Sequence, residues 1–318
     1  MRDNGVTRRA PRLVVSESSP RLPLFVTRLP YVSDGMKSSG KLFLIALALA
    51  CASPAGWAAT ITVKGSDTMV ILAQKWAEVY MSKNPATKIQ INGSGSGTGF
   101  AALQNQTTDL CNASRKIRAS EIAGCLKSFG HRPTEYQVAL DGLSVYVHDS
   151  SPVTELTVEQ VRLIFTGRIR NWNQVGGQDA PITLYSRENN SGTYEFFKEH
   201  VLDGRDFAAS AQTVQGTAAV LEVVARDKNG IGYGGAAYGK GAKHLAIKMD
   251  KDSPAIEPTE ETVVHGTYPF WRHLFIYVNP AVDTGGVAAY LRWIRSDDGQ
   301  KVVQEVGYFP LPAGLRAK

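Results

Sequence analysis

Residues 186–197 of the chain read SRENNSGTYEFF. Arg187 follows the apolar run 182–185, and four residues later the triplet 191–193 (Ser-Gly-Thr) opens a segment with the apolar spacing of a helix. The first turn of a helix has free N–H groups and a partial positive charge, so it attracts anions. Hydroxyl groups and a guanidinium beside such a turn predict an oxyanion site. The alternative is an ordinary helix start, in which Ser191 caps the helix and Arg187 is solvated.

Two more segments repeat this order of strand, Gly/Ser/Thr loop and helix. Residues 92–99, NGSGSGTG, separate the strand-like run 88–91 from a helical pattern that begins at Phe100. Residues 64–68, KGSDT, follow the apolar run 61–63 and lead into a long amphipathic segment. One such junction is ordinary in an α/β protein, whereas three in one chain predict convergence on a single anion.

Residues 36–59 have the pattern of a cleavable signal peptide. A basic start precedes nine apolar residues, LFLIALALA, and small residues end the segment. Nine apolar residues are too few to cross a bilayer as a helix. We therefore predict export to the periplasm with cleavage after Ala58 or Ala59. Residues 1–35 show no apolar periodicity, and we interpret them as a gene-model extension before a true start at Met36.

Cys51 raises a second possibility, which is a lipid anchor. A lipid-attachment site usually has a larger aliphatic residue three positions before the cysteine, and this chain has Ala48 there. We rank lipidation below plain cleavage, and the sequence leaves the choice open.

The leader also accounts for the basic composition of the chain. The full sequence has 35 Lys and Arg against 29 Asp and Glu, but its first 59 residues hold eight basic and three acidic ones. The remainder has 27 basic residues against 26 acidic ones, a net charge of +1. A nearly neutral mature chain gives no electrostatic reason to expect nucleic acid as a partner.

Cys111 and Cys125 are the two cysteines that follow the leader. In an exported protein an even pair 14 residues apart predicts a disulfide, and the alternative is two buried thiols. A loop of that size would add on the order of 3 kcal/mol of stability. The six histidines show neither HExxH nor paired-cysteine spacing, so we expect no metal and no cofactor.

The mature chain alternates strand-like and helical patterns throughout. This alternation predicts an α/β protein with mostly parallel sheets flanked by helices and with loops gathered at the strand C-termini. About 259 residues exceed a typical single core and indicate two lobes. β-rich runs near 142–148 and 272–278 predict the two crossings between them. We place residues 60–141 and 244–318 in lobe 1 and residues 142–243 in lobe 2.

These segments together resemble the periplasmic phosphate-binding proteins of ABC-type uptake systems, within the type II solute-binding superfamily. The resemblance covers about residues 60–315 and rests on the order and spacing of six motifs. The motifs are GSDTM at 65–69, GSGSGTG at 93–99, ASR at 113–115, FTG…NW at 165–172, R…SGT at 187–193 and GIGY at 230–233. The resemblance implies a two-lobed Venus-flytrap fold, capture of inorganic phosphate in the interlobe cleft, delivery to a membrane permease, and a monomer without enzymatic activity.

The resemblance also assigns ligand residues to the three junctions. They supply hydroxyl groups, backbone N–H groups and one guanidinium, and they are Ser66, Thr68, Met69, Ser96, Gly97, Arg187, Ser191, Gly192 and Thr193.

One position departs from the family pattern. The best-known members have an aspartate after Ala-Ser in the third strand, which accepts the remaining proton of phosphate and rejects sulfate, whereas this chain has Arg115. A second guanidinium attracts a dianion but cannot accept a proton. We therefore assign Arg115 to the anion site and expect Asp141 or Asp67 to supply the acceptor. For Asp141 the alternative is a turn residue before Gly142.

Other functions fit parts of the pattern. A receptor for sulfate, molybdate or tungstate would use the same anion cradle. An exported phosphoester hydrolase or a phosphate sensor is a further alternative, although the sequence shows no clearly placed nucleophile, base or metal cluster for hydrolysis. The GxGxxG match at 230–235 begins a strand instead of following one, which argues against a dinucleotide site.

Overall fold

The computed structural model describes residues 59–239 and 241–316. The predicted gene-model extension, nearly all of the signal peptide and the possible lipid site at Cys51 lie outside these residues. In the part of the chain that is described, no helix is both long and apolar enough to span a membrane.

Strands and helices alternate along most of the chain. The strands are β1 (Ala59–Gly65), β2 (Thr87–Gly93), β3 (Leu110–Ala113), β4 (Thr134–Val147), β5 (Glu155–Thr157), β6 (Thr183–Arg187), β7 (Gln212–Val214), β8 (Gly230–Gly235), β9 (Lys243–Lys248) and β10 (Trp271–Val278). The α-helices are α2 (Val70–Lys83), α3 (Ser96–Gln104), α4 (Ala119–Phe129), α5 (Val158–Phe165), α6 (Gly192–Phe196), α7 (Thr217–Arg226), α8 (Glu260–Val264), α9 (Gly285–Arg295) and α10 (Asp297–Val306). A 3-10 turn, η1 (Asp67–Met69), leads into α2, and a π-helical turn, η3 (Phe197–Val201), extends α6.

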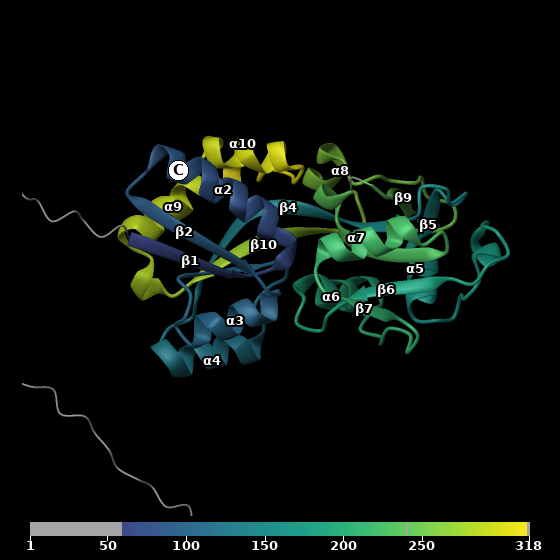
Figure 1. The fold of residues 1–318 in the computed structure, drawn as a ribbon, viewed down its shortest axis with the longest axis horizontal. Helices are drawn as coiled ribbons and strands as arrows, with labels where there is room; N and C mark the ends of the chain where they lie inside the picture. Colours follow the sequence, from purple (N-terminus) through teal and green to yellow (C-terminus); the bar gives the residue numbers. More distant parts are fainter. Residues whose placement is uncertain (1–58, 240, 317–318) are drawn as a thin grey trace, which may run out of the picture. The chain divides into compact units, whose positions relative to one another are not determined.

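The long strand β4 connects two groups of strands. The strand order is β2-β1-β3-β10-β4-β8-β6-β7, and β9 pairs with β4 and β5. β1 is parallel to β2 and β3, and β6 is parallel to β7 and β8. β4 pairs with β10 over residues 134–142 and with β8 over residues 143–147, in both cases antiparallel. β4 and β10 therefore mark the two passages of the chain between the lobes, and the predicted two-lobed α/β architecture is confirmed (Figure 1). The sheets are mixed and not mostly parallel, because every pairing of β4 and β10 is antiparallel.

Each lobe has its own hydrophobic core. In the first lobe, α2, α9 and α10 cover one face of the strands and α3 and α4 cover the other (Figure 1). Trp76 of α2 and Ile294 of α9 are buried in the core of the first face. In the second lobe, Phe165, Phe197 and Tyr233 pack with their rings 4.0 to 5.5 Å apart. Two cores leave a seam between them; β4 runs across it, and β10 begins at it.

The second core continues beyond the predicted lobe boundary at residue 243. Leu245 and Ile247 of β9 are buried in it, and Val263 and Tyr268 are buried in it as well. β9 also pairs with β4 and β5 on that side. We therefore propose that the chain returns to the first lobe near residue 270, at the start of β10.

Cys111 and Cys125 are free thiols, so the predicted disulfide is not present. Both side chains are buried with Phe100 and Tyr277, where they pack as small apolar groups. Burial raises the pKa of both thiols, and that of Cys125 reaches about 11. Protonated, buried thiols of this kind are structural rather than reactive.

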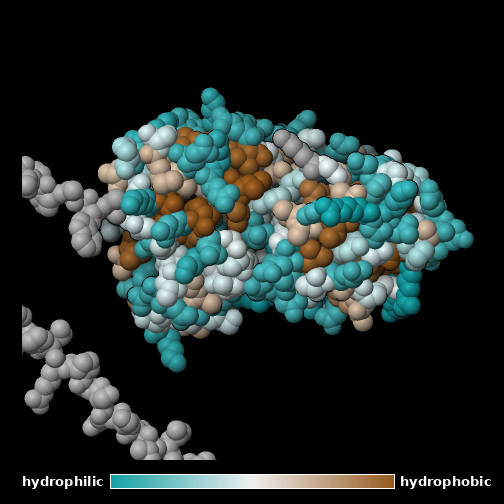
Figure 2. All heavy atoms as spheres, viewed as in Figure 1, coloured by the Kyte–Doolittle hydropathy of each residue, from teal (hydrophilic) through white to brown (hydrophobic). Residues whose placement is uncertain are grey.

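The molecular surface is mixed. Hydrophilic residues cover most of the face shown in Figure 2, with hydrophobic patches over α2 and beside α7. The exposed large hydrophobic side chains of the described residues, among them Leu126 and Met249, are far apart in the sequence. Exposed apolar residues of this kind are normal for a folded protein.

Candidate anion-binding site

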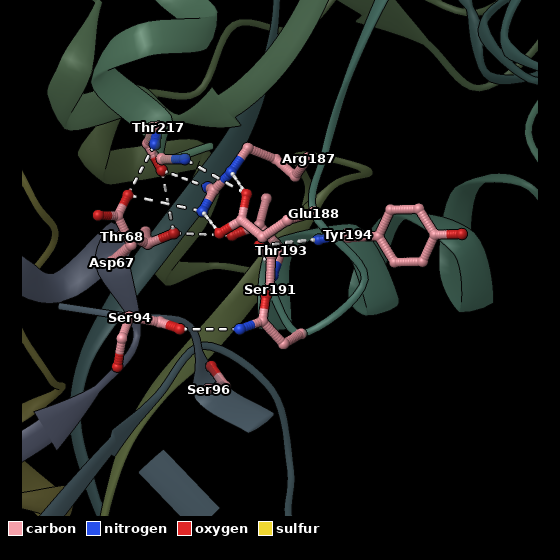
Figure 3. A network of polar contacts seen from close by, with 12 residues as sticks. Asp67, Thr68, Ser94, Ser96, Arg187, Glu188, Ser191, Thr193, Tyr194 and Thr217 are labelled. Carbon is pink, nitrogen blue, oxygen red and sulfur yellow. Dashed lines mark hydrogen bonds and ion pairs between the residues drawn. The ribbon is translucent and has the colours of Figure 1, made fainter. Parts of the chain in front are cut away.

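Helix starts from both lobes meet at the seam. The hydroxyl Oγ1 of Thr68, in η1, lies 2.7 Å from Oγ1 of Thr193 in α6 and 3.4 Å from Oγ1 of Thr217 in α7 (Figure 3). Near the start of α3, the N–H of Gly97 donates to the carbonyl of Asn190 in the other lobe at 2.9 Å. The three predicted junctions therefore lie together, and the start of α7 is a fourth.

The hydroxyl groups at these helix starts are almost completely buried. Thr68 is 1% exposed, and Ser96, Thr193 and Thr217 are 0% exposed. Ser96 Oγ also accepts a hydrogen bond from the N–H of Ser114 at 3.1 Å. Burying several hydroxyls is costly unless each has a partner, and each can donate a hydrogen to an anion. We refer to Thr68, Ser96, Thr193 and Thr217 as the hydroxyl cluster.

Arg187 brings a positive charge to the hydroxyl cluster. Its Nη1 donates to Thr217 Oγ1 at 2.6 Å, while Nε and Nη2 donate to the two oxygens of Glu188 at 2.9 and 2.8 Å (Figure 3). Burial raises the pKa of Glu188, but its hydrogen bonds and charge interaction with Arg187 outweigh this and lower the pKa below the ordinary value. Glu188 is therefore an ionised carboxylate that fixes the orientation of the guanidinium.

The start of α6 is packed too closely for any residue but glycine. Ser191 caps the helix, because its Oγ accepts from the N–H groups of Thr193 and Tyr194. At Gly192, a Cβ atom would lie only 2.3 Å from Ser96 Oγ in the opposite lobe. The two sides of the seam thus touch at this glycine.

Three other predicted donors, from Met69, Gly97 and Ser66, differ in whether the protein supplies a hydrogen-bond acceptor for them. The N–H of Met69 donates to the carbonyl of Ser66 at 3.2 Å, and the N–H of Gly97 is held by Asn190. The hydroxyl of Ser66 is buried and has no hydrogen-bond partner among the described residues. Ser66 Oγ is therefore the group of the three that retains a free donor.

Asp141 and Arg272 form a buried ion pair at the lobe crossing. They face each other in the β4–β10 register, and Nε and Nη2 of Arg272 donate to Oδ2 of Asp141 at 3.0 and 2.7 Å. The same Nη2 donates to Thr193 Oγ1 at 3.0 Å. Oδ1 of Asp141 is buried without a partner among the described residues. A Cβ atom on Gly235 would lie 2.9 Å from this Oδ1 and 3.3 Å from Thr68 Cγ2, so the free oxygen borders the hydroxyl cluster.

Asp67, the other candidate acceptor, is already engaged. Its Oδ2 accepts from the N–H of Thr217 at 2.7 Å and lies 3.5 Å from Arg187 Nη2. Its side chain is 27% exposed, whereas Asp141 is 0% exposed. Asp141 is therefore the better placed of the two.

The geometry of Arg115 does not favour its predicted role as an anion ligand. Its Nη1 and Nη2 donate to the oxygens of Glu121 at 2.8 and 2.7 Å, and its Nε forms a 2.6 Å ion pair with Glu195 of α6. Arg118 contacts the same oxygen of Glu195 at 2.5 Å. Carboxylates hold these nitrogens, and Arg115, unlike Arg187, makes no hydrogen bond to the hydroxyl cluster among the described residues, so we leave Arg115 out of the anion site. It links the two lobes instead.

Three residues of the site were missed by sequence reasoning. Thr217 follows Gly216 at a helix start, so the same Gly-Thr signal was available for it. Ser114 lies in the ASR motif at 113–115, which therefore offered a signal for it. Arg272 carried no local signal, because its role depends on the register between β4 and β10.

The described residues offer no group of three His, Cys, Asp or Glu side chains arranged to hold a metal ion. What they do offer is a set of buried hydroxyls and the guanidiniums of Arg187 and Arg272. This donor set is suited to an oxyanion.

Comparisons with known proteins agree with this chemistry. A family model described as a PBP superfamily domain matches residues 52–298. The phosphate-binding protein PstS of Pseudomonas aeruginosa is 33% identical over 315 residues, which cover 94% of this chain and 98% of that protein. PstS of Bacillus subtilis is 31% identical over 254 residues, covering 79% and 81%. A Clostridium perfringens structure, described as a phosphate ABC transporter substrate-binding protein with bound phosphate, superposes with a TM-score of 0.73 and 26% identity over 80% of this chain and 100% of that one.

Proposed function

The chain belongs to the PBP superfamily and, within it, to the phosphate-binding proteins of the PstS type, and we propose from this membership that it captures inorganic phosphate between its lobes and delivers it to an ABC permease. The relatives carry phosphate in their names, and the Clostridium perfringens structure contains it. This favours phosphate over sulfate, molybdate or tungstate as the cargo.

The observation that carries the proposal is the buried hydroxyl cluster with Arg187 beside it. A buried dianion costs many kcal/mol unless donors surround its oxygens. Hydroxyls from both lobes and the guanidinium of Arg187 are such donors, and Ser66 adds one without a partner among the described residues. We assign phosphate binding to these groups and to Ser191 and Gly192 at the start of α6.

Closure of the lobes completes the site. Thr68 and Ser96 belong to the first lobe, whereas Arg187, Thr193 and Thr217 belong to the second. Asn190 of the second lobe also donates to the carbonyl of Ser94 at 3.0 Å across the seam. Phosphate that bridges the lobes would therefore stabilise the closed form, and separation of the lobes at the permease would release it.

We propose Asp141 as the residue that selects phosphate. At neutral pH phosphate carries at least one proton and sulfate carries none. The unpartnered Oδ1 of Asp141 is an acceptor for that proton, and it would repel a sulfate oxygen.

We further propose a monomeric, periplasmic receptor without enzymatic activity. The relatives are named as binding proteins, and a receptor that opens and closes needs both lobe surfaces free. Cleavage of the predicted signal peptide would place the protein in the periplasm.

Calorimetry of the mature protein with phosphate, arsenate and sulfate tests the proposal, together with a phosphatase assay. We expect a single phosphate site that prefers phosphate over sulfate, and no turnover of p-nitrophenyl phosphate. Sulfate binding as tight as phosphate binding, or measurable hydrolysis, would contradict it.

A further inference from the structure

A cavity lies at the seam beside the hydroxyl cluster, and Arg272 borders both. Its volume is about 600 Å³, which is within the usual range for small-molecule sites. The loop after β3 forms one wall, the α6–η3 turn of the other lobe forms the second, and β10 forms the third. The cavity is thus assembled from both lobes and from a crossing strand.

Aromatic rings line part of this cavity. Phe196, Trp271 and Phe275 line it, but the ring of Phe196 is already covered, since His200 stacks on it at 4.2 Å and the guanidinium of Arg272 lies 5.2 Å from its centroid. Trp271 is therefore the ring that a ligand can reach. The π-helical turn η3 widens the helix here, and such turns occur frequently at functional sites. Flat aromatic surfaces of this kind bind another ring by stacking or by edge contacts.

The charges of the arginines at this cavity are largely compensated. Glu195 holds Arg115 and Arg118, and Asp141 holds Arg272. A doubly charged ion such as inorganic phosphate would therefore find little excess positive charge.

Some polar groups of the cavity remain available. Lys116 is exposed and has no ion pair among the described residues, while Glu199 adds one acidic group to the lining. Nδ1 of His273 is buried without a hydrogen-bond partner in the described part of the chain. Burial and the nearby charge of Lys116 lower the pKa of His273, so its ring is neutral and offers one hydrogen bond without adding charge.

We propose that this interlobe cavity binds a small aromatic monoanion, with its ring against Trp271 and its charged group near Lys116. The site needs walls from both lobes, so it belongs to the closed form. Any ligand that binds the closed form shifts the lobes toward it, and phosphate does the same. The two ligands therefore favour each other's binding.

The test uses 1-anilinonaphthalene-8-sulfonate, a fluorescent aromatic monoanion, with the mature protein. We expect saturable binding at one site, and an affinity that rises about fivefold or more when phosphate is saturating. Lys116→Glu and Trp271→Leu should each weaken probe binding about tenfold and leave phosphate affinity within about threefold of the wild type. Lys251→Glu reverses an exposed lysine outside the cavity and is the matched control, which should bind the probe normally.

Several outcomes would overturn the proposal. Probe binding that does not saturate, or that Lys116→Glu leaves unchanged, would mean that the cavity is not the site. A probe affinity that is the same with and without saturating phosphate would mean that one lobe alone binds the probe. Phosphate calorimetry on the same samples keeps the two proposals apart, since phosphate binding without probe binding refutes only this one.

Discussion

Replacement of Asp141 by asparagine tests how the site distinguishes phosphate from sulfate. The side chain is 0% exposed, and its Oδ2 accepts two hydrogen bonds from Arg272. An asparagine oxygen can keep those two bonds, and the amide NH2 then replaces the unpartnered Oδ1. Asp141→Asn therefore places a donor where the wild type has an acceptor, with almost no change in volume.

The expected loss of phosphate affinity follows from that one hydrogen bond. A hydrogen bond to a charged group contributes about 1.5–3 kcal/mol, so phosphate affinity should fall about 10- to 150-fold. Sulfate loses no hydrogen bond and no longer faces a carboxylate, so its affinity should stay or rise. The ratio of phosphate affinity to sulfate affinity is therefore expected to drop at least about tenfold.

Calorimetric titrations of both anions measure this ratio directly. Loss of one charge from a buried ion pair costs up to about 3–5 kcal/mol of stability, so thermal unfolding must first show that the variant is folded at the titration temperature. Asp67→Asn is the matched control, because the Asp67 carboxylate already accepts from Thr217. An unchanged ratio in Asp141→Asn would refute the acceptor role, and a drop in Asp67→Asn alone would assign it to Asp67.

Four further predictions concern the surroundings of the anion. Arg187→Ala should weaken phosphate binding by about 2–4 kcal/mol, because the buried anion loses its guanidinium, and a loss below tenfold in calorimetry would make Arg187 peripheral. Gly192→Ala should hold the lobes apart, because its Cβ would lie 2.3 Å from Ser96 Oγ. Small-angle scattering with saturating phosphate should then show a less compact protein than the wild type, and equal compaction would contradict this. Glu195→Gln should weaken phosphate and sulfate binding equally, by about 1.5 kcal/mol or roughly tenfold, because it weakens the ion pair with Arg115 that joins the lobes. Unequal losses in calorimetry would place Glu195 in the anion site itself. Burial raises the pKa of Glu188, but Arg187 lowers it overall, so the ionised carboxylate stabilises the fold above about pH 4.5 and this stabilisation is lost as the pH falls through the lowered pKa. The melting temperature of Glu188→Gln should therefore depend less on pH below about 4.5 than that of the wild type. Parallel curves of melting temperature against pH for the two proteins would argue against the pairing.

The features that the sequence predicted well depend on local order. A strand, a glycine-rich turn and a helix start are adjacent in the chain, so their pattern can be read from neighbouring residues. The crossings expected near 142–148 and 272–278 correspond to β4 and β10 for the same reason, since each is a stretch of neighbouring residues rich in strand-forming side chains. In α/β proteins the C-terminal ends of parallel strands share an edge, which explains how three separate junctions could be expected at one place.

The features that sequence reasoning missed depend on pairing between distant residues. Asp141 meets Arg272 only through the β4–β10 register, 131 positions along the chain. Arg115 was predicted as an anion ligand without its ion pair to Glu195, which belongs to the other lobe. The predicted disulfide rested on the spacing and compartment of Cys111 and Cys125, and spacing does not report whether two side chains are positioned to bond or only to pack.

If Asp141 selects the anion as we propose, Arg272 connects that selection to lobe closure. Its Nη2 donates both to Asp141 Oδ2 in the crossing strand and to Thr193 Oγ1 in the second lobe. An anion that repels Oδ1 of Asp141 therefore disturbs the guanidinium that also holds α6 against the first lobe. Phosphate can donate its proton to Oδ1 and leave both contacts of Arg272 in place, whereas sulfate cannot. Discrimination between phosphate and sulfate would then depend on lobe closure more than on the first binding step. Sulfate can enter the open cleft, but the lobes close on it less completely, and a partly closed receptor binds its ligand less tightly.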